Sequence, residues 1–206
     1  MEVEYLSRQA IANLALGCWI GAEAVRVGQL AGHGAFAIVD IAIIAALAIA
    51  AIFVLIRPAP KQQDGSLSAL VVALAAAVCP FLYLLLPGPP ALPNVTGLAL
   101  QVVAVAIMLT ATLVLGRNYS IVPQYRWLVS GGPYAFVRHP LYASYLVFDA
   151  TLAFQHPSAL SVMMWLAEAA LFDWRARREE GLLAASDPAY LGYAEHVRWR
   201  FIPYVI

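Results

Sequence analysis

Four long apolar stretches constrain this chain more than any other feature of its sequence. They run approximately over Gln9–Gln29, Ala35–Ile56, Leu67–Leu86 and Val95–Leu115. A helix needs about 20 predominantly apolar residues to cross the ~30 Å hydrocarbon core of a bilayer, so each stretch is long enough to span it. Proline and glycine punctuate the connections after the second and third stretches. The pattern predicts four transmembrane helices within residues 1–115.

The composition supports a membrane protein rather than a soluble one. Hydrophobic residues make up 63% of the 206 residues and charged residues only 12%, whereas soluble domains carry about 25% charged residues. The net charge is zero and no basic stripe is present, so nucleic acid is not expected as a partner. No linker divides the chain, which predicts a single domain over 1–206. Cys18 and Cys79 lie in apolar runs and are expected to be buried side chains rather than disulfide or metal ligands.

The pattern changes after Gly116. Residues 117–140 are mixed, aromatic and basic, and predict an interfacial loop. The apolar runs Leu141–Phe154 and Ala159–Trp174 would each cover only about 21–24 Å as helices. They predict a helical hairpin that dips into the membrane or extends into the interface. The expected fold class is therefore all-α, a polytopic transmembrane helical bundle with a C-terminal helical hairpin, in which 116–206 form a second, functional region.

The distribution of lysine and arginine predicts the orientation, because cytoplasmic loops concentrate these residues. If the N-terminus is cytoplasmic, all of the 12 basic residues except Arg26 fall on the cytoplasmic side. The tail after Trp174 is too charged to span, and Asp187 with Pro188 predicts the start of a further short helix. We therefore expect a multi-pass protein whose termini, 117–140 loop and tail all face the cytoplasm.

Ionisable residues inside the apolar stretches suggest function, because they are costly in a membrane. Glu23 and Arg26 stand three residues apart, so mutual neutralisation is the simpler account. Asp40, Asp149 and Glu168 have no obvious partner in the sequence. Two accounts of Asp149 and Glu168 stay open, since they can face each other across the hairpin or contact a substrate.

The stretch "GGPYAFVRHPLYASY", residues 131–145, gathers polar and aromatic side chains at one point. The glycines suit a close approach of the backbone to a polar ligand, and Tyr134, His139 and Tyr142 could bracket a flat heterocycle. The competing interpretation is the aromatic and basic belt found at the interface of any membrane protein. Further along, Arg175 and Glu179 are four residues apart, which suits either a surface ion pair or a charged pocket wall.

Three segments carry a resemblance to a known family. "GPYAFVRHPLY", then "EEGLL", then "YLGYAEHVRWRFIP" resemble in order and spacing the signature of the isoprenylcysteine carboxyl methyltransferase family and its phospholipid methyltransferase relatives. The resemblance covers roughly residues 115–206. It implies S-adenosylmethionine as cofactor, and methyl transfer to a lipophilic or amphiphilic acceptor at the membrane–cytoplasm interface. The lipid bilayer and a lipid-like small molecule are then the expected partners.

The same resemblance implies individual site residues. Arg175 matches the arginine placed toward the substrate, and Arg175 and Glu180 are the implied catalytic residues. Ser144 and Tyr145 replace the Gly-Trp that follows this motif in the isoprenylcysteine enzymes, which leaves the acceptor open. The implied cofactor-binding residues are Gln124, Arg126 (where the eukaryotic enzymes have histidine), Trp127, Leu128, Val129, Tyr134, His139, Pro140, Leu141, Tyr142 and Glu179.

Two other functions fit parts of the pattern. Membrane sterol or enone reductases that use NADPH resemble this C-terminal architecture, although the Glu179–Glu180 pair with Arg175 fits the methyltransferases better. A non-enzymatic scaffold or carrier would need no cofactor. The methylated atom, the acceptor and the oligomeric state stay open at this point.

Overall fold

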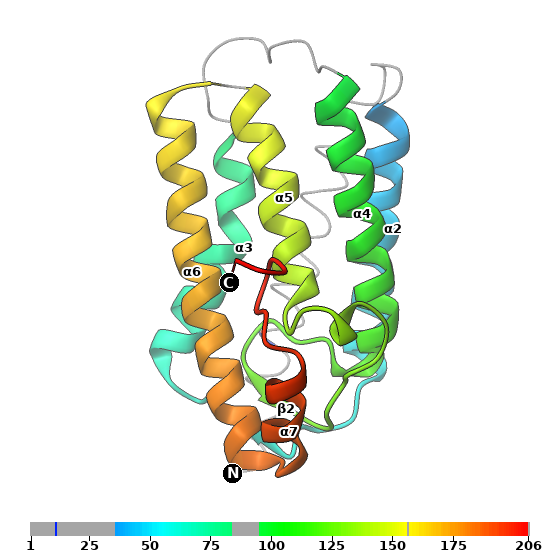
Figure 1. The fold of residues 1–206 in the computed structure, drawn as a ribbon, viewed down its shortest axis with the longest axis vertical. Coiled ribbons are helices and arrows are strands. Elements are labelled where there is room, and N and C mark those ends of the chain that lie inside the picture. The colour runs from blue at the N-terminus through cyan, green and yellow to red at the C-terminus, as the bar shows by residue number, and fades with distance from the viewer. Residues whose placement is uncertain (1–10, 12–35, 84–94, 156, 206) are drawn as a thin grey trace.

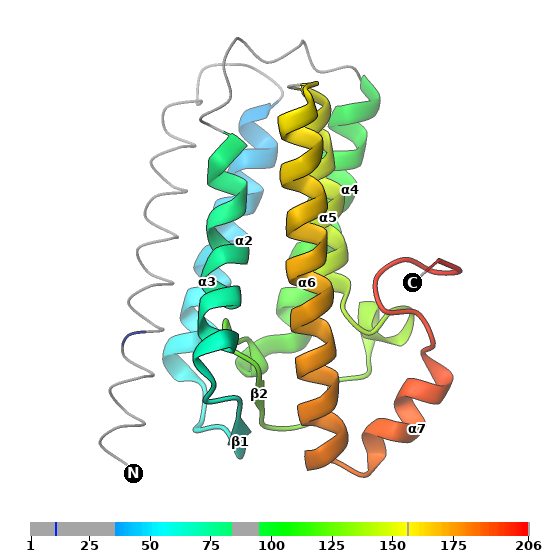
Figure 2. The same ribbon diagram turned by 90° about the vertical axis from the view of Figure 1, so that its left-hand side faces the viewer.

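The computed structural model describes residues 11, 36–83, 95–155 and 157–205. Within these residues, five long helices run side by side as a bundle and a sixth, shorter helix lies at one end (Figures 1 and 2). Apart from Ile11, the apolar stretch Gln9–Gln29, with Cys18, Glu23 and Arg26, lies outside the described residues, as does the side chain of Asp40. The helices are α2 (Phe36–Ile56), α3 (Leu67–Leu82), α4 (Val95–Leu115), α5 (Pro140–Gln155), α6 (Ala159–Ser186) and α7 (Ala189–His196).

The predicted boundaries hold for α4 and for the start of α3. The predicted apolar run Ala159–Trp174 forms the first part of α6, and the helix continues through the charged residues to Ser186, over 28 residues in all. Arg, Glu, Ala and Leu in the extension are strong helix formers, so charge does not interrupt the helix. An ion pair between Arg177 and Asp173, 2.6 Å apart at Nε and Oδ2, adds support one turn apart.

The bundle turns large apolar side chains outward and packs small ones inside. Ile41, Leu55 and Leu67 are among the exposed residues, whereas Ala69 and Ala111 are fully buried. Small residues allow close helix approach, as in membrane bundles. Within the described ranges, Val95–Asn118 is the one helix long and apolar enough to cross a membrane, and Ile41–Ile56 and Leu67–Cys79 are shorter apolar helices. Several membrane spans therefore stay a prediction.

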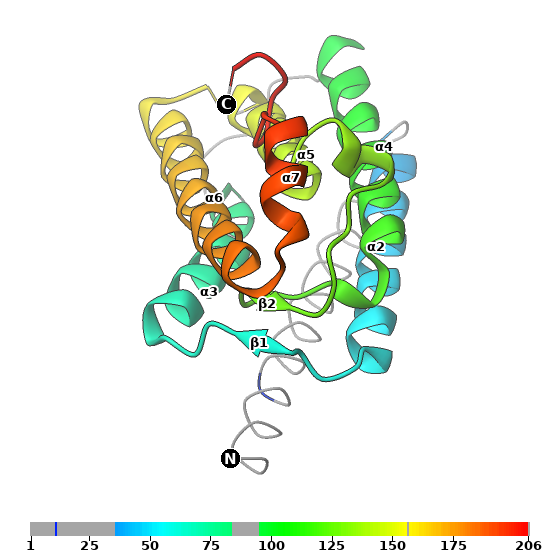
Figure 3. The ribbon, with the colours of Figure 1, turned by 60° about the horizontal axis from the view of Figure 1, so that its bottom comes forward.

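The segment between α4 and α5 is pinned by a small sheet that the sequence did not predict. Strand β1 (Gln62–Gln63) pairs antiparallel with β2 (Gln124–Tyr125) at the lower end of the bundle (Figure 3). Two-residue strands carry no hydrophobic periodicity, so sequence patterns cannot reveal them. Two 3-10 turns, η2 (Gly116–Asn118) and η3 (Gly132–Ala135), complete the segment. At Gly132, φ is +58° and a Cβ would lie 2.9 Å from a Val114 methyl, so this turn requires glycine.

The C-terminal tail returns from α7 to the start of α5 (Figure 2). The backbone N–H groups of Arg138 and His139 donate to the carbonyls of Trp199 and Arg200, each at 2.9 Å. The tail therefore fixes the backbone just before α5. Asp187 ends α6 and accepts a hydrogen bond from the Ala189 N–H at 3.0 Å, so α7 begins close to the predicted position.

Candidate active site

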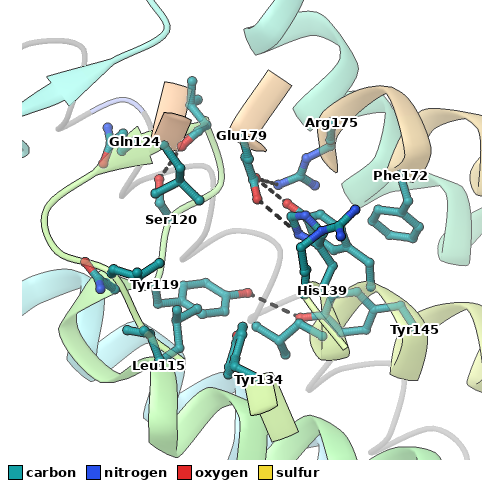
Figure 4. A pocket seen from close by; sticks show the side chains of 18 of the residues that line it. Leu115, Tyr119, Ser120, Gln124, Tyr134, His139, Tyr145, Phe172, Arg175 and Glu179 are labelled. Atoms are coloured by element: carbon teal, nitrogen blue, oxygen red, sulfur yellow. Dashed lines mark hydrogen bonds and ion pairs between the residues drawn. The ribbon is translucent and has the colours of Figure 1, made fainter. Parts of the chain in front are cut away.

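A cavity of about 180 Å³ opens where the segment between α4 and α5 meets α6 (Figure 4). Most of the residues predicted for the site line it together, although they come from distant parts of the chain. Arg126, Pro140 and Glu180 are the predicted site residues that do not line it. The predicted residues in the lining are Gln124, Trp127, Leu128, Val129, Tyr134, His139, Leu141, Tyr142, Arg175 and Glu179.

One wall of the cavity is a stack of rings. His139 and Tyr142 are almost parallel, with centroids 5.3 Å apart and 2° between their planes. Tyr142 in turn stacks on Phe172 of α6 at 4.9 Å and 17°. Pro140 begins α5 between the two motif rings, and its fixed φ suits the first position of a helix. Although Pro140 does not line the cavity, it begins the helix that carries Tyr142 and so helps to fix where this ring lies.

Glu179 presents a carboxylate beside this wall. The Tyr142 hydroxyl donates a hydrogen bond to Oε1, and His139 Nδ1 lies 3.7 Å from Oε2. Arg175 Nη2 lies 4.0 Å from Oε1, one turn away on the same helix. The Glu179 side chain remains 23% exposed, so its carboxylate is open to a ligand. Figure 4 shows these interactions converging on Glu179.

Arg175 is buried under the ring stack. Its Nη2 donates to the Ile121 carbonyl at 2.6 Å, and its guanidinium lies 5.0 Å from the Tyr142 ring centroid. Among the residues that the structure describes, the buried Nε has no hydrogen-bond partner. A buried donor without a partner costs about 1–3 kcal/mol. The guanidinium therefore keeps an N–H donor at Nε that a ligand could use.

Glu180 does not line the cavity, unlike its neighbour Glu179. It accepts hydrogen bonds from Arg138 Nε at 2.8 Å, His139 Nε2 at 3.2 Å and Arg200 Nη2 at 3.0 Å. Burial opposes ionisation of this carboxyl, but the three donors outweigh it and hold the pKa of Glu180 well below its usual range. Glu180 thus joins α6 to the loop and to the tail.

Gln124 begins β2 (Gln124–Tyr125), and Arg126 directly follows this strand. The Gln124 side chain lines the cavity, and its amide is held at both ends. Its Oε1 accepts from Arg126 Nη2 at 2.8 Å, and its Nε2 donates to Gln63 Oε1 at 3.1 Å. Arg126 is fully buried, and its Nε donates to the Pro58 carbonyl at 2.8 Å. Arg126 therefore orients the Gln124 amide from behind the cavity wall.

The structure adds lining residues that the sequence did not indicate as ligands. The hydroxyls of Tyr119 and Tyr145 lie 3.5 Å apart, and Tyr193 donates to the Tyr134 carbonyl at 2.7 Å. Burial raises the pKa of Tyr193 to about 12, which keeps this phenol a donor. Phe172 stands three residues before Arg175, a spacing that could have placed it on the same helix face. Further lining residues are Asn118, Ser120, Arg138, Glu168 and Tyr190.

The pairing of Asp149 with Glu168 is confirmed. The two carboxyls lie on α5 and α6, are close enough to interact electrostatically, and are almost completely buried. Glu168 also lines the cavity, at the end away from Glu179. The hairpin therefore carries an acidic pair that touches the same space as the predicted site.

Comparison with known proteins agrees with this geometry. Residues 95–185 match the model of the isoprenylcysteine carboxyl methyltransferase family, whereas no curated protein matches the chain. The matched segment begins at the first residue of α4 and ends in the last turn of α6. It includes the loop, the ring stack and the charged face of α6. The match supports membership of the isoprenylcysteine carboxyl methyltransferase family, a family of membrane-bound methyltransferases.

Proposed function

We propose that this protein transfers a methyl group from S-adenosylmethionine to a lipophilic or amphiphilic acceptor at the membrane–cytoplasm interface. The observation that carries the proposal is a single cavity with two chemically different walls. The loop and the lower part of α6 supply polar groups, including Gln124 and Glu179, whereas helices of the bundle supply Ala76, Ala77 and Leu115. A polar cofactor and a lipid-like acceptor can therefore meet there.

The polar wall suits the proposed cofactor. S-adenosylmethionine supplies an electrophilic methyl group carried on a positively charged sulfonium. The ring face of Tyr134 attracts a cation, and the Glu179 carboxylate, which accepts from the Tyr142 hydroxyl, lines the same cavity. The Gln124 amide, held between Arg126 and Gln63, offers a fixed hydrogen-bonding group. These residues would hold the cofactor by charge, ring contact and hydrogen bonding.

Arg175 would hold the acceptor. An arginine with an unused donor binds a carboxylate or phosphate through charge-assisted hydrogen bonds. Burial of the guanidinium keeps water from competing for that contact. Methyl transfer by in-line displacement depends on alignment of the reactants, so positioning by Arg175 can supply much of the rate. The acceptor's lone pair would form the new bond to the methyl carbon as the carbon–sulfur bond breaks, with S-adenosylhomocysteine as the leaving group.

Glu180 would act by positioning. It touches His139 and two arginines but not the cavity, so its predicted catalytic role would pass through the imidazole. With Nε2 held by Glu180, the Nδ1 edge of His139 faces Glu179. The loop and the wall of the cofactor site would then be aligned by a contact outside the cavity.

We further propose a multi-pass arrangement with the termini and this cavity facing the cytoplasm. The outward apolar faces of α2, α3 and α4 support burial in lipid. Near the cavity, Arg138 and Arg200 lie at the loop and the tail, and Arg178 lies in the charged C-terminal part of α6. A soluble cofactor would then enter from the cytoplasm and the acceptor from the bilayer.

Equilibrium binding tests the proposal directly. Purified protein in lipid nanodiscs should bind S-adenosylhomocysteine and show no comparable affinity for NADPH, as measured by calorimetry. Membrane extracts incubated with labelled S-adenosylmethionine should then yield a methylated lipid-like product only when the protein is present. Affinity for NADPH but not for S-adenosylhomocysteine would support a reductase instead of a methyltransferase. Affinity for neither molecule would favour a non-enzymatic role.

A further inference from the structure

The acidic pair in the hairpin has no role in the function proposed so far. Asp149 is 2% exposed and Glu168 is fully buried, yet both belong to helices made mainly of apolar residues. Buried carboxyls in such surroundings are expensive unless they are paired or bind a ligand. Two carboxyls in contact cannot both ionise easily, so the pair is expected to share one proton and keep one negative charge.

The pair also leaves hydrogen-bonding capacity unused. Apart from Asp149, the Glu168 carboxyl oxygens have no hydrogen-bond partner in the described part of the chain. The Tyr83 hydroxyl interacts electrostatically with both carboxyls, although Tyr83 is only 4% exposed and its hydroxyl has no partner among the same residues. A tyrosine hydroxyl is normally paired when buried. Glu168 of α6 and Tyr83, just beyond the end of α3, thus bring buried groups with unused hydrogen-bonding capacity close to Asp149 of α5.

Of the three groups, Glu168 lines the cavity that contains Arg175, whereas Asp149 and Tyr83 lie outside the lining and interact electrostatically with Glu168. Glu168, Phe172 and Arg175 all line this cavity, and their spacing of four and three residues places them on one face of α6. Seven residues of helix separate Glu168 from Arg175, which corresponds to about 10 Å along the axis. The cavity therefore offers a cationic group and an anionic group at separate positions, with an aromatic ring between them.

Building on the proposed function, we propose that Glu168, Asp149 and Tyr83 form a second acceptor subsite that binds a protonated amine. The acceptor would then be an amphiphile with an ammonium group about 10 Å from the group held by Arg175. A cation neutralises the charge of the acidic pair and donates hydrogen bonds to the Glu168 oxygens. An alcohol of the same length could donate a hydrogen bond but would leave that charge uncompensated.

The probes are octylamine and 1-octanol, titrated by calorimetry into protein-loaded nanodiscs with empty nanodiscs as the blank. The wild-type protein should bind octylamine at least about tenfold more tightly than octanol, because hydrogen bonds to charged groups are the stronger kind. Glu168→Gln should lose that preference but keep its affinity for S-adenosylhomocysteine. Glu195→Gln, which changes an exposed carboxyl on α7, should behave as the wild type.

Equal affinity of the wild type for both probes would overturn the subsite, and so would an unchanged preference in Glu168→Gln. If Glu168→Gln does not fold, Asp149→Asn and Tyr83→Phe replace it, and the wild-type comparison decides by itself. Binding of S-adenosylhomocysteine without an amine preference removes the subsite alone. An amine preference without S-adenosylhomocysteine binding removes the proposed methyl transfer and leaves an amine-binding site.

Discussion

His139 donates a hydrogen bond from Nε2 to Glu180 Oε1 across 3.2 Å, which ties the loop to α6 outside the cavity. Arg200 of the tail binds the same carboxylate, and the Arg200 carbonyl accepts from the His139 backbone N–H. Loop, helix and tail therefore share one ionised group. The position of His139 in the ring stack therefore depends on its contact with Glu180 as well as on its contact with Tyr142.

Low pH should weaken the contacts that the ionised Glu180 makes with the loop and the tail. The pKa of Glu180 is lower in the folded protein than its ordinary value of 4.5. The carboxylate therefore stabilises the fold above about pH 4.5, and the contribution is lost as the pH falls below that value. Thermal unfolding between pH 7 and pH 3.5 should show a steeper loss of stability for the wild type than for Glu180→Gln. Parallel pH profiles would mean that Glu180 carries no such linkage.

The ring stack should determine cofactor affinity. His139→Ala removes one stacked ring, and Tyr142→Phe removes the hydroxyl that binds Glu179. Each change should weaken S-adenosylhomocysteine binding by roughly five- to a hundredfold, since a lost hydrogen bond at a buried ligand costs about 1–3 kcal/mol. Calorimetry on folded variants measures this, with Tyr204→Phe at an exposed position as the control. Unchanged affinity in both variants would mean that His139 and Tyr142 belong to an interfacial aromatic belt and do not contact the cofactor.

Arg175 and Glu179 should separate acceptor binding from cofactor binding. Arg175→Ala should reduce turnover by about 100-fold, since a misplacement of about 1 Å can cost that much, while cofactor affinity stays near wild type. Glu179→Ala should weaken S-adenosylhomocysteine binding itself. Arg177→Ala is the matched control, because Arg177 lies on the same helix but is exposed.

Two measurements decide this division: turnover with an identified acceptor, and cofactor affinity by calorimetry. Full activity in Arg175→Ala would reduce the arginine to a structural partner of Glu179. Loss of cofactor affinity in Arg175→Ala as severe as in Glu179→Ala would merge the two roles.

The proposed orientation predicts which side of the membrane carries the loop. Ser130 is exposed next to the Gly131–Gly132 turn. A cysteine at this position, in a background without Cys18 and Cys79, should resist an impermeant thiol reagent in intact cells and react after permeabilisation. Ready labelling of intact cells would reverse the orientation.

Several features were determined by the sequence alone, because they depend on local properties. The bounds of α4 follow from its continuous apolar run, which begins at Val95 after proline-rich residues and ends before Gly116. The grouping of Tyr134, His139 and Tyr142 follows from their closeness in the chain. The contact between Asp149 and Glu168 follows from the short turn of the hairpin and the cost of leaving either carboxyl alone.

Only the tertiary structure decided the features that depend on long-range pairing. Strand β1 meets β2 across about sixty residues of chain, and the tail meets Arg138 at a similar separation. Such backbone contacts leave no local pattern in the sequence. Glu179 and Glu180 show the same limit most clearly. They are neighbours in the chain, but successive side chains point about 100° apart around a helix of 3.6 residues per turn. One carboxylate therefore lines the cavity, and the other binds the loop and the tail.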